Sequence, residues 1–389
     1  MTRPRVVQTS IGLFHHFDLA RQMERLGLLE AIFTGYPRWK LRDAGLPPEK
    51  VKTFPWLQAF YLAKDRMGLN APWLDCALAW RSLELLDSHV ARQLPECNVF
   101  IGLSGAGLRT GRVARQRGAR HICDRGSSHI RLQDQILRDE FRRWGQLFPG
   151  VDERIAGKEE AEYAEADQIT VASEFALKSF IARGVPAERL RKIPYGVELD
   201  RFERVADPER DCFRILAVGQ VSFRKGFPYL LEAFQKLNHP RKQLRLVGAV
   251  QPEIRTWLRG RATEKVEFAG AQPQRDLPAL MSRAHVLVLA SVEDGFGLVL
   301  AQAMACGCPV IATEHTGGPD MITNGIEGFV VPIRDSTALA DRLEQLGQDS
   351  DLRGKMSEAA VERVKRCGGW NDYGEAFARL CLELAARRN

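Results

Sequence analysis

The stretch "VEDGFGLVLAQAMACGCPVIA", Val292 to Ala312, places three glycines, two acids and a glutamine around a short apolar segment. The preceding run, "HVLVLAS", is almost wholly apolar, which is typical of a strand covered on both faces. "LVLAQAMAC" has a helical pattern, so "VEDGFG" is predicted to be a strand-to-helix turn. Its glycines permit close backbone approach, and the start of the helix offers free N–H groups that suit an anion such as a diphosphate.

Asp294 and Gln302 flank this turn, one before the predicted helix and the other in its second turn. Both can reach a ligand seated over the start of the helix. The alternative is that Asp294 is only a charge near a helix N-terminus and that Gln302 lies on a solvated face. From these residues alone both interpretations stay open.

The rest of the chain alternates strands with helices, which predicts doubly wound parallel sheets. The first half contains the strand-like runs "RVVQTS", "EAIFTG", "NVFIGLSG", "RHICDRG" and "QITVAS". After the polar stretch "ERVADPERDC" the alternation restarts with "FRILAVG", so we expect one domain over residues 1–202 and a second from residue 210. Two such domains in series leave a cleft between them, and parallel sheets bind ligands at the carboxyl ends of their strands.

The composition limits the class of protein. The chain has 389 residues, 45% hydrophobic and 27% charged, as expected for a folded multidomain protein. It has neither an apolar run of membrane-spanning length nor a secretion signal, so we expect a cytoplasmic protein. Its eight cysteines form no C-x-x-C pair, and no zinc-finger or RNP-like segment supports nucleic-acid binding.

Two segments are compatible with a contact between the protein and a membrane. Leu108–Gly126 is rich in arginine, and Val51–Trp80 carries aromatic residues that include Trp56, Phe60 and Trp73. A solvated basic face and a core helical hairpin are the simpler interpretations. The alternative is a peripheral contact with the inner face of a membrane or with a lipid tail.

The long motif "SVEDGFGLVLAQAMACGCPVIATEHTGG" resembles the donor-site signature of glycosyltransferase family 4. This family contains retaining sugar transferases of the GT-B architecture, in which two Rossmann-like domains face each other across a cleft. "ILAVGQVSFRKGFPYLLEAF" and "IPYGVELDRF" are similar to two further motifs of the family, in the same order. The resemblance implies domains at 1–202 and 210–370, and a C-terminal helix, 371–389, that crosses back to the first domain.

The resemblance also implies roles in donor binding and catalysis. Lys225 aligns with the lysine that grips the donor diphosphate, and Arg224 can restore the charge lost where Gln220 replaces the family's arginine. Asp294 stands in for the first of the family's two glutamates, which meets the donor sugar, and Gln302 stands in for the second, which binds the ribose. The remaining donor-binding residues predicted on this basis are Gly219, Gln272, Gly295, Phe296, Gly297 and Leu298.

Residues of the first half are predicted to line the acceptor side. Gly12 precedes the first predicted helix, where His15 or His16 can point into the cleft or serve only a structural purpose. The segment "CDRGSSHIRLQ" places many polar groups after a strand, although helix capping also explains its serines. From this segment we select Arg125, Ser127 and His129.

The predicted reaction moves a sugar from a UDP- or GDP-type donor to a hydroxyl of a saccharide or lipid-linked acceptor, in polysaccharide or glycoconjugate biosynthesis. We expect neither a metal nor another cofactor. Two alternatives stay open: a noncatalytic nucleotide-sugar-binding subunit, suggested by Gln220 and Gln302, and a nucleotide-sugar epimerase of the same architecture. A dehydrogenase is excluded, since no G-x-G-x-x-G follows the first strand.

Overall fold

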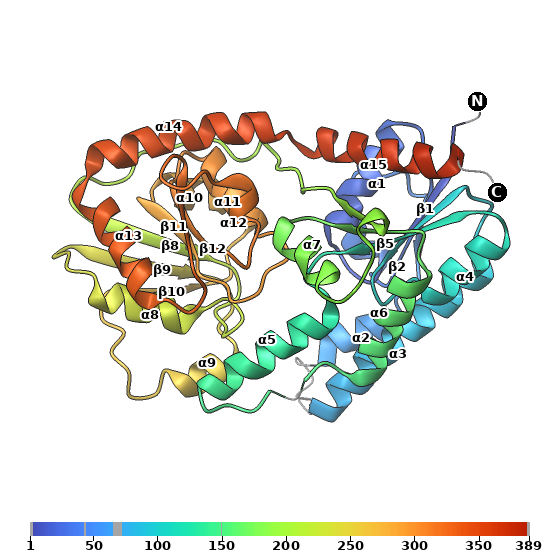
Figure 1. Ribbon diagram of the computed structural model, residues 1–389, viewed down its shortest axis with the longest axis horizontal. Helices are drawn as coiled ribbons and strands as arrows, with labels where there is room; N and C mark the ends of the chain where they lie inside the picture. Colours follow the sequence, from blue (N-terminus) through green and yellow to red (C-terminus); the bar gives the residue numbers. More distant parts are fainter. Residues whose placement is uncertain (1–2, 43, 65–71, 149, 387–389) are drawn as a thin grey trace.

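The computed structural model describes residues 3–42, 44–64, 72–148 and 150–386. Two parallel α/β sheets lie side by side along the long axis of the molecule, as Figure 1 shows. The predicted doubly wound fold is therefore confirmed. We call the part built on the first sheet the first domain and the part built on the second sheet the second domain.

The first sheet has the strand order β3-β2-β1-β4-β5-β6-β7 within the described residues. All of its pairings are parallel. The strand order changes direction between β1 and β4, so the loops after these two strands leave the sheet next to a crevice. The strands are β1 Val6–Ser10, β2 Leu29–Thr34, β3 Val51–Thr53, β4 Val99–Leu103, β5 Arg120–Arg125, β6 Gln168–Val171 and β7 Leu190–Lys192.

Helices cover both faces of this sheet (Figure 1). They are α1 His15–Arg25, α2 Trp56–Ala63, α3 Pro72–Gln93, α4 Leu108–Gln116, α5 Ile130–Arg143, α6 Glu153–Glu165 and α7 Glu174–Ile181, with short 3-10 turns at Arg38–Leu41 and Ala187–Arg189. The predicted aromatic segment 51–80 contains β3, α2 and the start of α3. Its residues 65–71 and the side chain of Trp73 lie outside what the structure describes, while Trp56 is 80% exposed.

The second sheet has the order β10-β9-β8-β11-β12-β13, again parallel. Its direction changes between β8 and β11, which places the loops after these strands at the second crevice. The strands are β8 Phe213–Val218, β9 Lys242–Val247, β10 Val266–Gly270, β11 Val286–Leu289, β12 Val310–Thr313 and β13 Gly328–Val331. The helices are α8 Phe227–Lys236, α9 Pro252–Trp257, α10 Leu277–Ser282, α11 Leu298–Ala305, α12 Gly318–Met321, α13 Ser336–Gln348 and α14 Ser350–Cys367, with a 3-10 turn at Gln274–Asp276.

The last helix, α15 Trp370–Ala386, leaves the second domain and runs beside α1 of the first (Figure 1). Its side chains Tyr373, Phe377 and Leu384 belong to the same buried cluster as Val6 and Ile101 of the first sheet. The chain therefore returns to the first domain to complete that domain's core.

Helix α5 connects the domains in the opposite direction, from the first domain to the second. It begins in the first domain and extends toward α9 of the second (Figure 1). Phe141 and Trp144 pack against the second domain's core, with the Trp144 ring 5.4 Å from that of Trp257. Arg334 of the second domain bonds the buried Glu140 carboxylate at 2.7 Å. The two domains thus share packed apolar surface and a buried ion pair.

None of the described helices is a candidate for insertion into a membrane. Within the described residues, no helix combines the length and the apolar character needed to span a bilayer.

Candidate active site

The cavity that bears on function lies between the domains and has a volume of about 600 Å³, within the range typical of ligand pockets. We call it the interdomain cavity. Phe14 and His15 at the start of α1 line it from one side, and Leu298 and Gln302 of α11 line it from the other. The predicted ribose contact Gln302 therefore lies in a cleft formed by both domains.

The start of α11 is suited to an anion. Gly297 adopts a left-handed conformation with φ of 77°, and a β-carbon there would collide with the Leu289 side chain. No side chain of a described residue caps this end of the helix. Since Leu298 borders the interdomain cavity, the first amides of α11 are available to a ligand there.

Lys225 and Asp294 meet at the carboxyl ends of β8 and β11. The Lys225 ammonium bonds the Asp294 carboxylate, and both side chains are largely buried. Gly219 lies next to the Lys225 side chain, whereas Gln220 is exposed. The two residues predicted to act on the diphosphate and on the donor sugar are thus brought together.

Glu293 is an acid that the sequence interpretation missed. Its fully buried carboxylate accepts bonds from Ser127 Oγ and Ser128 Oγ, both at 2.7 Å, and from Gln133 at 3.1 Å. Arg224 of its own domain donates to it at 2.8 Å. Burial alone would raise the pKa of this carboxyl, but the guanidinium and the hydrogen bonds outweigh burial and lower the pKa to about 2.

This arrangement gives Arg224 and Ser127 protein partners. Arg224 also donates to Ser127 Oγ at 3.2 Å, so both predicted site residues contribute to the junction between the domains. Gly295 lies at the same junction, because a β-carbon there would collide with the backbone of Gly126. Glycine at this position is required by a neighbouring loop of the first domain, a contact that the motif did not reveal.

Arg125 and His129, predicted on the acceptor side, face protein groups. The Arg125 guanidinium pairs with Glu159 at 2.7 Å, and His129 caps α5 by accepting from the Arg131 amide at 3.2 Å. Burial lowers the pKa of His129 to about 4. Neither residue lines the interdomain cavity, so the geometry does not support their predicted part in acceptor binding.

Two other residues predicted to bind the donor, Phe296 and Gln272, also contact protein groups. Phe296 is buried and packs edge-on against Tyr195, with ring centroids 5.3 Å apart. Gln272 is exposed and donates to the Ala269 carbonyl at 2.7 Å. Its neighbour Gln274 is the glutamine of this loop that lines the interdomain cavity.

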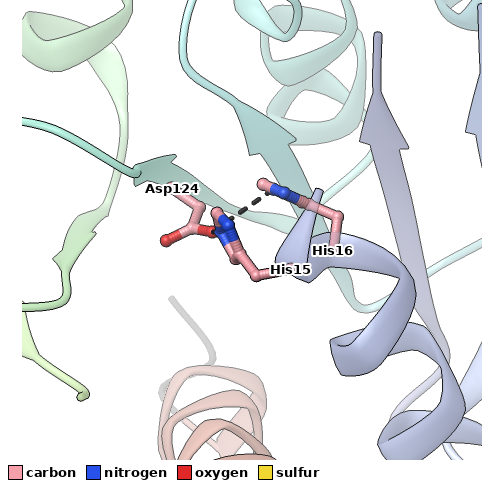
Figure 2. A group of neighbouring side chains, drawn as sticks. All are labelled: His15, His16 and Asp124. Atoms are coloured by element: carbon pink, nitrogen blue, oxygen red, sulfur yellow. Dashed lines mark hydrogen bonds and ion pairs between the residues drawn. The ribbon is translucent and has the colours of Figure 1, made fainter. Parts of the chain in front are cut away.

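His15 and His16 both approach Asp124 at the end of β5, as Figure 2 shows. Nε2 of His15 lies 2.6 Å from Asp124 Oδ2, and Nε2 of His16 lies 3.3 Å from the same atom. Burial, followed by the neighbouring His15, lowers the pKa of His16 to about 3. Gly12, also predicted here, is buried just before α1, where its carbonyl accepts from Ser10 at 2.8 Å.

These three side chains are of the types that bind metals, and their candidate ligand atoms lie within 4.8 Å of one another. Two ligands of a tetrahedral zinc ion lie about 3.4 Å apart when each bond is about 2.1 Å. The 2.6 Å separation between His15 and Asp124 is instead that of a direct hydrogen bond. The arrangement therefore fits a His–Asp pair better than a metal centre.

Comparisons with known proteins agree with this geometry. Residues 200–363 match the family model described as glycosyl transferases group 1. D-inositol 3-phosphate glycosyltransferase of Corynebacterium jeikeium is 32% identical over 219 residues, 50% of this chain and 52% of that protein. Amylovoran biosynthesis glycosyltransferase AmsK of Erwinia amylovora is 27% identical over 198 residues, 48% of this chain and 49% of that protein. The chain thus spans about half the length of these curated relatives.

The likeness in structure extends over the whole chain. The crystal structure of Anabaena HepE in complex with UDP-glucose has a TM-score of 0.71 and covers 98% of this chain and 100% of that chain, at 15% identity. Residues 200–363 are therefore similar to the glycosyl transferases group 1 family, and the chain as a whole has the GT-B fold.

Proposed function

We propose that this protein is a retaining glycosyltransferase that moves a sugar from a nucleoside diphosphate donor to a hydroxyl group. One observation carries the proposal. Lys225 bonds Asp294, the Asp294 carboxylate lies close to Gly297 at the uncapped start of α11, and Leu298, the first residue of α11, lines the cavity that both domains form. A transferase needs this combination, because it must hold a diphosphate and present the attached sugar to a second substrate.

Charge stabilisation is the first part of the mechanism. When the bond between the sugar and the diphosphate breaks, negative charge grows on the leaving phosphate. The amides of α11 and the Lys225 ammonium are placed to receive that charge, and an ammonium about 4 Å from a phosphate in a sheltered cleft contributes about 4 kcal/mol before desolvation. An incoming diphosphate takes Lys225 from Asp294, which frees that carboxylate to hold hydroxyls of the donor sugar.

The nucleoside is proposed to lie in the interdomain cavity. Gln302 and Gln274 can each donate and accept hydrogen bonds, as a ribose diol and a base edge require. UDP is the first nucleotide to test, since HepE binds UDP-glucose in a similar fold. No metal or cofactor enters this proposal, because the protein supplies its own cation.

The acceptor is proposed to be a saccharide or a lipid-linked saccharide. The amylovoran relative is named for polysaccharide biosynthesis, which supports this class. Trp39 and Trp56 of the first domain are each exposed, and this supports the proposal of a cytoplasmic, peripheral contact with a membrane that carries such an acceptor.

Calorimetry with UDP and GDP, followed by turnover of UDP- and GDP-sugars, tests the proposal. We expect one nucleotide to bind more tightly, and its sugar to be transferred to a saccharide or released to water. Nuclear magnetic resonance of the product then reports whether the anomeric configuration is retained. Binding without any turnover would instead identify a noncatalytic subunit, and interconversion of donors without an acceptor would identify an epimerase.

A further inference from the structure

Glu293 joins the two domains through its side chain. It lies between β11 and α11 of the second domain and has no exposed surface. Its Oε1 accepts from Ser127 Oγ and Ser128 Oγ, both at 2.7 Å, and from the Ser128 amide at 3.2 Å. Its Oε2 accepts from Gln133 Nε2 at 3.1 Å and from Arg224 Nε at 2.8 Å. All of these donors except Arg224 belong to the first domain, so the carboxylate keeps these bonds only while the domains are in contact.

Arg125 holds the donors of the first domain in place. Its Nε donates to the Ser128 carbonyl at 3.0 Å, and its Nη2 donates to Gln133 Oε1 at 2.9 Å. Because the Gln133 oxygen accepts from Arg125, the amide nitrogen is the atom that donates to Glu293. Arg125 is itself paired with the buried Glu159 at 2.7 Å. The polar segment that follows β5 is therefore arranged to receive a carboxylate.

Glu293 does not reach a substrate itself. It does not line the interdomain cavity, and both of its carboxylate oxygens face protein donors. Burial would raise its pKa, but the Arg224 guanidinium and the hydrogen bonds outweigh burial and lower the pKa to about 2, so it has no proton to donate at neutral pH. Any part that it takes in the reaction must be exerted through neighbouring residues.

Those neighbours are the pair proposed to act on the donor. Asp294 follows Glu293 in the chain, Lys225 follows Arg224, and the Lys225 ammonium bonds the Asp294 carboxylate. The two segments are also joined by their backbones, since the Val292 amide donates to the Arg224 carbonyl at 2.9 Å. A displacement of Glu293 therefore moves Lys225 and Asp294 as well.

The backbones of the two domains meet at the same place. A β-carbon on Gly295 would lie 1.9 Å from the carbonyl oxygen of Gly126. A side chain at position 295 would push the two loops apart and draw Glu293 away from Ser127 and Ser128. Glycine at this position thus permits the hydrogen bonds that Glu293 makes.

We infer that Glu293 is a positioning residue for the proposed transfer: the first domain binds its carboxylate, and this contact fixes Lys225 and Asp294 relative to the first domain's side of the cavity. The inference rests on the proposed function. The second domain is proposed to hold the donor, and the attacking hydroxyl is proposed to approach from the first domain. The reaction therefore needs a fixed distance between the domains, because a misplacement of about 1 Å can lower a rate by about 100-fold.

The alternative is a contact that only adds stability, as the ion pair between Arg334 and Glu140 does. The two roles differ in what they change. A purely structural contact affects the unfolding temperature and the fraction of folded protein, but it leaves kcat per nucleotide-binding site unchanged. A positioning contact lowers that kcat in protein that is folded and binds nucleotide.

The test removes hydroxyls of the first domain and leaves Glu293 in place. Ser127→Ala, Ser128→Ala and the double variant are compared with wild type in turnover of the productive UDP- or GDP-sugar. Calorimetric titration with UDP or GDP counts the binding sites. The single variants keep the test available if the double variant does not fold.

We expect the double variant to lower kcat per binding site by about 10-fold or more, with the Kd for the nucleotide within about 3-fold of wild type. The Kd should change little because Gln302, Lys225 and the start of α11 all belong to the second domain. Ser82→Ala is the matched control. Ser82 is buried in α3 of the first domain, and its hydroxyl has no hydrogen-bond partner among the described residues.

Hydrogen exchange gives a second readout that needs no turnover. The substitutions lie in the first domain, yet we expect residues 292–297 of the second domain to exchange faster in the double variant than in wild type or Ser82→Ala. Faster exchange there would show that the first domain restrains the turn that carries Asp294.

A folded double variant with the kcat per binding site of wild type would overturn the inference and leave the proposed function intact. A lower unfolding temperature with unchanged kcat would identify a purely structural contact and overturn it as well. Unchanged exchange of residues 292–297 would count against it in the same way. If the wild-type protein turns over no donor, it is the proposed function that fails.

Discussion

Lys225 is held by an acid of its own domain, Asp294, before any substrate enters. Removing its ammonium leaves α11 as the only proposed source of positive potential at the phosphates. We expect Lys225→Ala to lower kcat by about 100-fold or more, measured as donor turnover. Lys236→Ala is the matched control, because exposed Lys236 donates to the hydroxyls of Ser336 and Thr337, far in the chain from the proposed site residues. Activity near that of wild type in Lys225→Ala would remove this residue from the mechanism.

Glu293 makes the free energy of unfolding depend on pH. Its pKa is about 2 in the folded protein and 4.5 in an ordinary glutamate. Because the folded value is the lower one, the stabilisation is complete above pH 4.5 and is lost as the pH falls toward 2. The difference corresponds to about 3 kcal/mol. Denaturant unfolding of wild type and Glu293→Gln should therefore differ near neutral pH and converge in acid, and a constant difference would contradict this account.

The sequence alone identified some of the site residues and missed others. The difference has a physical reason. Lys225 and Asp294 follow β8 and β11 in recognisable motifs, so their meeting at the carboxyl ends of these strands could be expected. Glu293 and Asp124 could not be assigned, because Ser127, which bonds Glu293, and His15, which bonds Asp124, each lie more than 100 positions away in the chain. Only the folded structure, which brings these distant residues together, distinguishes a buried acceptor from an ordinary acid.

Helix α11 depends on the glycine that precedes it. Gly297→Ala should strain the backbone and displace Leu289, so we expect a loss of about 2 kcal/mol in the free energy of unfolding and weaker nucleotide binding. Gly354→Ala in α14 is the control, since a β-carbon there meets nothing within 4 Å and alanine favours helix by about 1 kcal/mol. Relative to wild type, Gly297→Ala should unfold at a lower temperature and Gly354→Ala at a higher one. Calorimetry should show weaker nucleotide binding in Gly297→Ala. Equal effects would show that the conformation of Gly297 is unimportant.

The order of strands and helices could be predicted from hydrophobic patterns, whereas the contact of α5 with the second domain could not. Phe141 of α5 and Trp144 just after it follow the same apolar pattern as residues of a helix that covers its own sheet. In the structure they contact the second domain, because α5 extends past the edge of the first. Periodicity identifies a buried face, but not the surface that buries it.

At the scale of the whole molecule, the ion pair between Arg334 and Glu140 is one of the contacts that join the domains. Arg334→Ala leaves a fully buried carboxylate without its cation, and we expect a loss of about 3 kcal/mol or more. Scanning calorimetry should show the single unfolding transition shifting down or dividing in two. Arg366→Ala, which removes an exposed pair with Glu362, should change little. An unaltered transition in Arg334→Ala would mean that the domains associate without this contact.

The path of α15 has a consequence for how the protein is made. The interior of the first domain includes Tyr373, Phe377 and Leu384, which leave the ribosome after the described strands of both sheets. The second domain is contiguous between β8 and α14, and all of its strands emerge earlier. During translation, the first domain must therefore wait for α15 before its core is complete, while the second domain can fold before that.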